Sequence, residues 1–249
     1  GEGAEGSGGA LMAKEIKLPE KHSVPTNWTW IDLGKLVQMK SGFPFDSKQF
    51  TADSQTGRPL IRIRDVVRGY TETFTAEDCP DEYIIHRGEI LIGMDGDFNC
   101  EKWNSDDALL NQRVCCIEST SQLLLDDFLY YYLPTPLKAI NEATPSVTVK
   151  HLSTKTLAKT PFPIPPIAEQ QRIVDRIEGL FAKLDEAREK VQEVVDGFES
   201  RKAAILHKAF TGELTAGWRN SHGMSLNCWK THCLKDCCKI GSGGTPSRK

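Results

Sequence analysis

The sequence predicts an α+β protein in which a mixed domain of short strands and helices, residues 14–163, precedes a long helix, residues 164–210. Two observations carry this prediction. Short apolar runs separated by turn residues recur through the first region, as expected for small strands. After Pro165 and Pro166, apolar residues recur at alternating steps of three and four, which is the spacing of a helix that pairs with another helix.

Four stretches define the mixed domain. LIRIRDVV (60–67) alternates apolar and charged residues, which predicts a half-buried strand. EYIIHRGEILIGMDG (82–96) contains two short apolar runs around a tight turn at Arg87-Gly88, and NQRVCCIE (111–118) is typical of another strand. DFLYYYLPTPLKAI (127–140) predicts a helix that ends near Pro134, followed by a second short helix.

The long helix is predicted to begin at the two prolines, because the first helical turn tolerates residues that lack an N–H group. Glu169 complements the positive end of the helix dipole, and Gly212 is expected to end the helix. A helix from about 166 to 210 is on the order of 65 Å long at ~1.5 Å per residue. Its apolar stripe, called the seam below, needs a second long helix that the chain does not supply; it consists of Ile173, Ile177, Leu180, Leu184, Ala187, Val191, Val194, Phe198 and Ile205.

The two ends of the chain differ in character. Residues 1–13 are glycine-rich and predict a disordered leader. Residues 211–249 are interpreted as a linker and the truncated start of a second domain, because a shift of 201 positions aligns Trp28 with Trp229 and Leu33 with Leu234. So short a fragment is too small for a core of its own, and we expect it to be disordered or loosely docked.

Composition restricts the class of protein. The net charge is −3, from 31 basic and 34 acidic side chains, without the basic excess that is usual for nucleic-acid binders. The sequence shows no transmembrane segment or secretory signal, which favours a cytoplasmic protein with no membrane partner. The eight cysteines lack a C-x-x-C pair, so we expect reduced thiols and no metal site. Phosphate-loop, adenine-methyltransferase and nucleophile-elbow motifs are missing, which argues against an enzyme.

Several strings carry a family likeness. PFPIPPIAEQQRIVDRIE (161–178) and ILHKAFTGELT (205–215) resemble the specificity subunit of type I restriction–modification enzymes. PLIRIRDV (59–66), GEILIGMDG (88–96), LLNQRV (109–114) and VTVKHLS (147–153) agree with the same resemblance.

The resemblance implies a target recognition domain at 14–163 and a conserved spacer helix at 164–210. In that family two such helices pack antiparallel, and the non-catalytic subunit reads a split target in double-stranded DNA. It bridges two adenine-N6 methyltransferase (M) subunits, which use S-adenosylmethionine, while restriction (R) subunits join that core. The chain itself is expected to bind no cofactor. It resembles half of such a subunit, which implies an antiparallel homodimer that reads a palindromic split site.

Candidate DNA-binding residues are polar side chains in these strings, since Arg suits guanine and Gln suits adenine. Each has a plain alternative as a surface charge or structural hydrogen bond, most of all Asp65, with Arg62 or Arg64 as its partner. The alternative to DNA recognition is a non-DNA coiled-coil scaffold that oligomerises through the seam, and the composition, with 17 basic and 21 acidic residues in the domain, does not decide between the two. The candidates are Lys40, Ser41, Arg62, Arg64, Arg68, Gln112, Arg113, Lys150 and His151.

Overall fold

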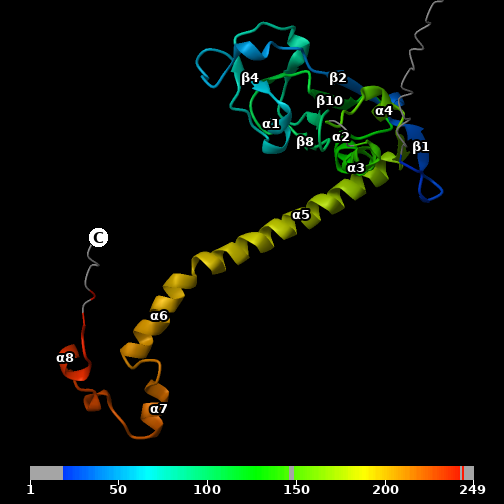
Figure 1. Ribbon diagram of the computed structural model, residues 1–249. Helices are drawn as coiled ribbons and strands as arrows, with labels where there is room; N and C mark the ends of the chain where they lie inside the picture. Colours follow the sequence, from blue (N-terminus) through cyan, green and yellow to red (C-terminus); the bar gives the residue numbers. More distant parts are fainter. Residues whose placement is uncertain (1–18, 146–148, 242, 244–249) are drawn as a thin grey trace, which may run out of the picture. The chain divides into compact units, whose positions relative to one another are not determined.

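Figure 1 shows the computed structural model, which describes residues 19–145, 149–241 and 243. The chain divides into two compact units, one ending at Leu180 and the other beginning at Phe181. The leader predicted for residues 1–13 lies outside the described residues. Within the described part of the chain, every helix is too short or too polar to span a membrane.

The first unit is built on three small sheets. Their strand orders are β2-β10-β7-β8, β3-β5-β4-β9-β6 and β1-β11. All pairings are antiparallel except that of β4 with β9. The strands are β1 (Thr29–Asp32), β2 (Val37–Ser41), β3 (Phe50–Thr51), β4 (Arg58–Ile61), β5 (Phe74–Thr75), β6 (Ile84–Ile85), β7 (Ile90–Gly93), β8 (Cys100–Lys102), β9 (Ala108–Leu110), β10 (Val114–Ser119) and β11 (Pro161–Ile164).

The four-stranded sheet is buried on both faces, which explains why its central strands are continuous apolar runs. Ile92 and Cys115 belong to the main core cluster, whereas Leu91 and Cys116 belong to a second cluster. Successive side chains of a strand point to opposite faces, so each strand contributes to both cores.

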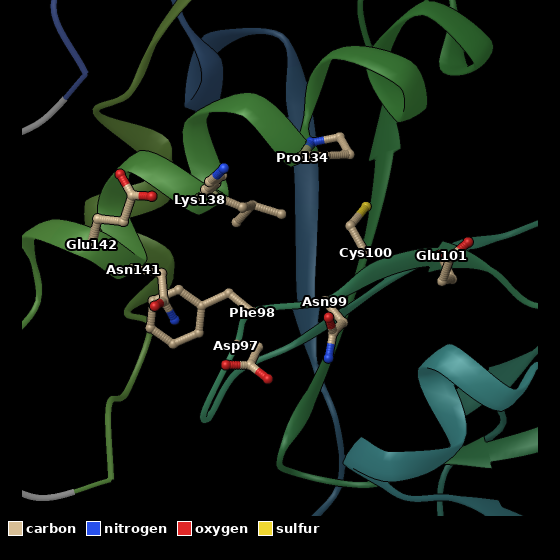
Figure 2. A pocket seen from close by; sticks show the side chains of 10 residues that line it. Asp97, Phe98, Asn99, Cys100, Glu101, Pro134, Lys138, Asn141 and Glu142 are labelled. Carbon is tan, nitrogen blue, oxygen red and sulfur yellow. The ribbon is translucent and has the colours of Figure 1, made fainter. Parts of the chain in front are cut away.

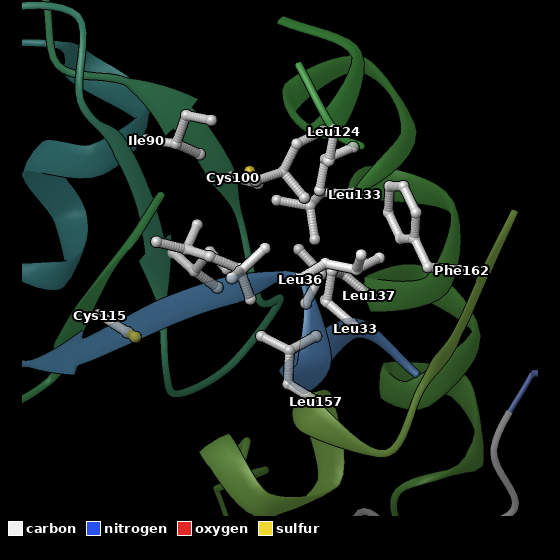
Figure 3. Packing of buried hydrophobic residues seen from close by; sticks show 14 of the residues in the cluster. Leu33, Leu36, Ile90, Cys100, Cys115, Leu124, Leu133, Leu137, Leu157 and Phe162 are labelled. Carbon is white, nitrogen blue, oxygen red and sulfur yellow. The ribbon is translucent and has the colours of Figure 1, made fainter. Parts of the chain in front are cut away.

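Helices cover the main core on one side. Figure 3 shows Leu124, Leu133 and Leu137 meeting Leu36 and Phe162 there. The predicted pair of helices around Pro134 is confirmed as α2 and α3. The helices of this unit are α1 (Ile63–Arg68), α2 (Asp126–Tyr132), α3 (Pro134–Ala143) and α4 (Thr154–Ala158), with 3-10 turns at Leu33–Lys35, Ser47–Gln49 and Asp81–Tyr83.

The strand predicted for residues 60–67 is wrong beyond its first two residues. β4 ends at Ile61, and α1 follows after Arg62. The Asp65 carboxylate accepts a hydrogen bond from the Arg62 N–H at 2.9 Å, which caps the helix, and Gly69 ends it at φ 72°. The alternating charges concealed this capping, which depends on a buried carboxylate.

The strand predicted for residues 111–118 is confirmed only in its second half. β10 begins at Val114, and residues 111–113 form a turn instead. The turn closes with the Val114 N–H donating to the Asn111 carbonyl at 2.9 Å. This places the polar part of LLNQRV outside the sheet.

The long helix is present, with one interruption. α5 (Ile167–Asp196) and α6 (Phe198–Phe210) are separated by Gly197. The helical hydrogen bonds continue across Gly197, which donates to Glu193 and accepts from Arg201, each at 3.0 Å. Figure 1 shows α5 and α6 meeting at an angle there. Gly212 follows α6 at φ 79°, as its predicted role in ending the helix requires.

The C-terminal segment contains α7 (Ala216–Ser221), a 3-10 turn (Leu226–Cys228) and α8 (Leu234–Cys237). Trp229 and Leu234 are exposed, so this stretch has no apolar core around them. In both parts of the predicted repeat a short helix begins at the matched leucine, Leu33 or Leu234. Residues 242 and 244–249 lie outside the description.

We expect two glycines to respond oppositely to alanine substitution. A Cβ at Gly179 or at Gly88 meets no atom within 4 Å, so only the backbone distinguishes the two positions. Gly179 lies inside α5, and Gly179→Ala should raise the unfolding free energy by about 0.5–1 kcal/mol. Gly88 has φ 96°, and Gly88→Ala should lower it by ~1 kcal/mol or more. Urea unfolding measures both, and equal effects would contradict the prediction.

Candidate nucleic-acid interface

Two loops from distant parts of the sequence interlock at one end of the first unit. The Phe43 N–H donates to the Leu110 carbonyl at 2.8 Å, and the Gln112 N–H donates to the Phe43 carbonyl at 3.0 Å. A Cβ at Gly42 would lie 2.1 Å from the Asn111 carbonyl oxygen, so only glycine fits this approach. The KSGFP loop (40–44) and the NQR turn (111–113) therefore form one surface, called the reading loops below.

A cavity of about 230 Å³ lies beside the reading loops. Arg62, Gln112 and Arg113, all predicted from the sequence, line it together. The guanidinium carbon of Arg62 lies 5.6 Å from the centre of the Phe50 ring, a cation–π contact that holds it in place. The remaining lining residues are Phe45, Ser47, Phe50, Ile63 and Asn111.

A single carboxylate connects the NQR turn to the VTVKHLS segment. Asp95 Oδ2 lies 2.6 Å from Arg113 Nη1, and Asp95 Oδ1 lies 2.7 Å from His151 Nδ1. The Asp95 side chain is 16% exposed, while those of Arg113 and His151 are 59% and 62% exposed. Exposed ion pairs add little stability, so the main effect of Asp95 is to orient two donors at the surface.

The Lys150 side chain makes hydrogen bonds within the first unit. Its Nζ donates to the main-chain and side-chain oxygens of Asn141 at 2.7 and 2.9 Å, and the Asn141 amide donates to the Gly96 carbonyl. Figure 2 shows Asn141 of α3 facing the hairpin that carries Asp97 and Phe98. Lys150 therefore ties α3 to this hairpin, which weakens its candidacy as a DNA contact.

The other candidates are dispersed. Lys40 Nζ donates to the Glu82 carbonyl at 2.6 Å, and Ser41 is exposed at the end of β2. Arg64 donates to Thr73 Oγ1 at 3.3 Å, and Arg68 lies in the last turn of α1. The structure thus gathers Arg62, Gln112 and Arg113 at the cavity beside the reading loops and joins His151 to Arg113 through Asp95, while the side chains of Lys40 and Arg64 make local contacts elsewhere.

Sequence reasoning did not select two residues of this surface. Asp95 lies in the string GEILIGMDG, and no local signal marks its two partners, Arg113 and His151. Asn111 is buried, and its Oδ1 atom has no hydrogen-bond partner within the described part of the chain, although it stands next to the selected Gln112. Only the meeting of residues distant in sequence identifies Asp95.

A second cavity of the first unit is lined by several acidic side chains. A cavity of about 480 Å³ between the 97–101 hairpin and α3 is lined by Asp97, Glu101 and Glu142, with Lys138 as its basic residue (Figure 2). Among the described residues no three His, Cys, Asp or Glu side chains are placed to hold a metal ion. With 17 basic and 21 acidic residues in 14–163, the domain as a whole offers little net attraction for phosphate.

The buried thiols are poor nucleophiles. Burial raises the pKa of Cys100 and that of Cys115 to about 12, and burial together with Glu89 raises the pKa of Cys116 still further. A thiol reacts as its thiolate, so these three groups are inert near neutral pH. They serve as small apolar residues of the two cores.

The seam is a second candidate interface. Ile173, assigned to it by spacing, packs against the main core, and Ile177 is half-buried. Farther along, in the second unit, the apolar side chains are open to solvent. A cavity of about 490 Å³ lies among Val194, Phe198 and Ile205. The exposed seam residues of this unit are Leu184, Ala187, Val191, Val194, Phe198 and Ile205.

Comparison with known proteins places these features in a family. The family model for the type I restriction modification DNA specificity domain matches residues 25–195, which include the reading loops and the start of the long helix. The match covers well over half of the chain. The chain belongs to this family, whose characterised members named below are specificity subunits rather than catalytic subunits.

Two relatives show the extent of the similarity. The chain is 40% identical over 193 residues to the EcoBI specificity subunit of Escherichia coli, covering 78% of this chain and 40% of that protein. It is 40% identical over 229 residues to the EcoKI specificity subunit of Escherichia coli K12, covering 85% of this chain and 48% of that protein. The chain therefore spans about half the length of the curated relatives it matches.

Solved structures share the fold. The HsdS subunit from Thermoanaerobacter tengcongensis aligns with a TM-score of 0.57 at 19% identity, over 78% of this chain and 48% of that one. A chain from a study of complex assembly and conformational transition of the type I R-M system aligns with a TM-score of 0.58 at 19% identity and the same coverage. The α+β fold with a long helix after the mixed domain is thereby shown.

Asp65 should prove structural and not a DNA contact. Its buried carboxylate accepts from the Arg62 N–H and from the Thr71 hydroxyl at 3.0 Å. We expect Asp65→Ala to lower the unfolding free energy by about 2–3 kcal/mol, because the partly buried Arg62 N–H loses its acceptor and the Thr71 hydroxyl loses one of two. Glu72→Ala, at an exposed position nearby, should change it by less than about 0.5 kcal/mol. Denaturant unfolding decides, and equal losses would refute the assignment.

Proposed function

We propose that the chain is the DNA sequence-recognition subunit of a type I restriction–modification complex and reads one half-site of a split target. The observation that carries this proposal is the convergence of Arg62, Gln112 and Arg113 at the reading loops of a domain that belongs to the specificity family. The reading loops are held by main-chain hydrogen bonds, which leaves these polar side chains available for base edges.

The geometry suits direct reading in a groove. A guanidinium pairs with two acceptors of guanine, and a glutamine amide pairs with the donor and acceptor of adenine. Asp95 holds one nitrogen of Arg113 and thereby limits the orientations of its guanidinium plane. Such pre-orientation favours a defined contact, since less side-chain freedom is lost on binding.

The charge of the domain favours shared binding of DNA. Affinity for duplex DNA comes largely from neutralised phosphates, and the domain carries 17 basic against 21 acidic residues. We infer that adenine-N6 methyltransferase subunits dock on the chain and supply most phosphate contacts. These subunits bind S-adenosylmethionine, the chain itself binds no cofactor, and R subunits join the cytoplasmic complex.

The open seam supports a homodimer. Leu184, Val191 and Phe198 are more than 60% exposed, and such a stripe is stable when it packs against another helix. Two copies related by a twofold axis pack these helices antiparallel and present two identical reading surfaces. Because protein symmetry is mirrored in the site, the target is then a palindrome with a central spacer.

The second candidate function is a coiled-coil scaffold that binds no DNA. The exposed seam and the slightly acidic composition are the observations in its favour. The two functions differ in one respect that is simple to measure. Recognition requires binding that depends on base sequence and on the methyltransferase, whereas a scaffold self-associates without either.

Methylation mapping tests the recognition function. The chain is expressed with a type I methyltransferase subunit, and adenine-N6 methylation is mapped across the genome with and without it. We expect one split motif that vanishes without the chain. Arg113→Ala should then weaken binding to that motif by about ten- to a hundredfold and relax one base position, as loss of one bidentate contact does.

The control for Arg113 is Arg87→Ala, which removes an exposed arginine at the turn between β6 and β7. Competition binding on duplexes derived from the motif should give it the wild-type base preference. Identical effects of the two substitutions would remove Arg113 from the reading surface, and methylation without any motif would exclude the recognition function.

The mass of the protein in solution tests whether the seam forms a dimer interface. Leu184→Glu places a charge in the stripe and should convert a dimer to a monomer at micromolar concentration, because burying an unpaired carboxylate is costly. Ala182→Glu introduces the same residue into α5 outside the seam, and the dimer should persist. Light scattering or sedimentation measures both. A wild-type chain that is monomeric throughout would contradict the homodimer.

A further inference from the structure

The first turn of α5 contains a buried amide whose three hydrogen bonds all lead out of the helix. Gln170 is fully buried. Its Oε1 accepts from the Leu125 N–H at 3.0 Å, and its Nε2 donates to the carbonyls of Leu123 at 2.7 Å and Pro165 at 2.8 Å. Both ends of the amide are therefore satisfied, by the segment before α2 and by Pro165, two residues before the helix begins.

Further contacts attach the same stretch of helix to the first unit. Glu169 accepts hydrogen bonds from the side chains of Asn27 and Trp28, each at 3.1 Å. Val174 is buried in the main core, and the Tyr131 hydroxyl lies 3.4 Å from Glu178 Oε1. We call these contacts, together with those of Gln170, the joint. Apolar packing alone permits small rotations, whereas the amide has a single satisfied orientation.

The joint lies in register with the seam. Gln170 precedes Ile177 by seven residues, so it occupies the heptad position of Ile177 one repeat earlier. Rotating the helix by one residue, about 100°, would withdraw the buried amide from the Leu125 N–H and from the Leu123 and Pro165 carbonyls and leave the amide unpaired. The joint thus fixes the direction in which Ile177 and Leu180 face relative to the mixed domain.

We propose that Gln170 is a positioning residue that sets the distance between the two half-sites. The inference rests on the proposed recognition function. Each base pair advances a half-site by about 3.4 Å and turns it by about 35°, so a change in spacer length must be matched by rotation of the reading surface. A helix whose rotation about its own axis is fixed at the joint accepts one spacer length. A loosened joint also accepts spacers one base pair shorter or longer.

Gln170→Met tests this inference, because it keeps the side-chain volume and removes all three hydrogen bonds. Gln171→Met is the matched control: Gln171 is exposed, and among the described residues its amide bonds only to Asp175 of the same helix, at 2.8 Å. Genome methylation is mapped for the full chain with its methyltransferase. In the wild type and in Gln171→Met, sites one base pair shorter or longer should stay below a hundredth of the native methylation rate.

With Gln170→Met the half-site bases should remain the same. The methylation rate at sites whose spacer is one base pair shorter or longer should rise at least tenfold. Should this variant fail to fold by circular dichroism, Glu169→Ala serves instead, since it removes only the contacts to Asn27 and Trp28 and should broaden the spacing less. Unchanged spacing in a folded variant with a lowered melting temperature reduces Gln170 to a structural amide. Altered half-site bases also overturn the inference, and a wild type without any motif overturns the recognition function itself.

Discussion

The arrangement of the first unit depends on how the long helix is attached to it. The buried Gln170 amide bonds the first turn of α5 to the residues before α2, and the α2 residues Phe128 and Leu129 belong to the main core. A satisfied polar group in an apolar surrounding permits one geometry, because every displacement leaves a buried donor or acceptor unpaired. The helix is consequently part of the domain for its first turns. Domain and helix share one core, which Val174 enters from the helix side.

The recognition surface follows a different physical principle. Main-chain hydrogen bonds between the KSGFP loop and the NQR turn hold the backbone, which frees polar side chains for external partners. Asp95 orients the side chains of Arg113 and His151, and its negative charge lowers the net positive charge of this surface. A domain with 17 basic and 21 acidic residues attracts phosphate weakly, and together with well-oriented donors this favours selectivity over affinity, in keeping with the proposed recognition beside methyltransferase partners.

The apolar residues of the long helix make different contacts in the two units of the chain. Within the first unit its apolar residues are covered by the core, as Ile173 and Val174 show. In the second unit the same spacing continues with exposed Leu184, Val191 and Phe198. One heptad pattern therefore serves two kinds of contact, with the domain of its own chain and with the helix that we propose comes from a second copy.

Much of this could be predicted from the sequence by itself, because the deciding forces are local. Heptad spacing, the prolines before α5, Gly212 after α6 and the strings of the specificity family are readable within short windows. Tertiary structure decided those features that depend on contacts between residues distant in sequence. The buried cap of Asp65 turned a predicted strand into α1, and a turn took the first residues of LLNQRV. The adjacent glutamines of AEQQ look alike in sequence, yet only Gln170 is buried, since the solvation of a polar side chain is set by residues that folding brings to it.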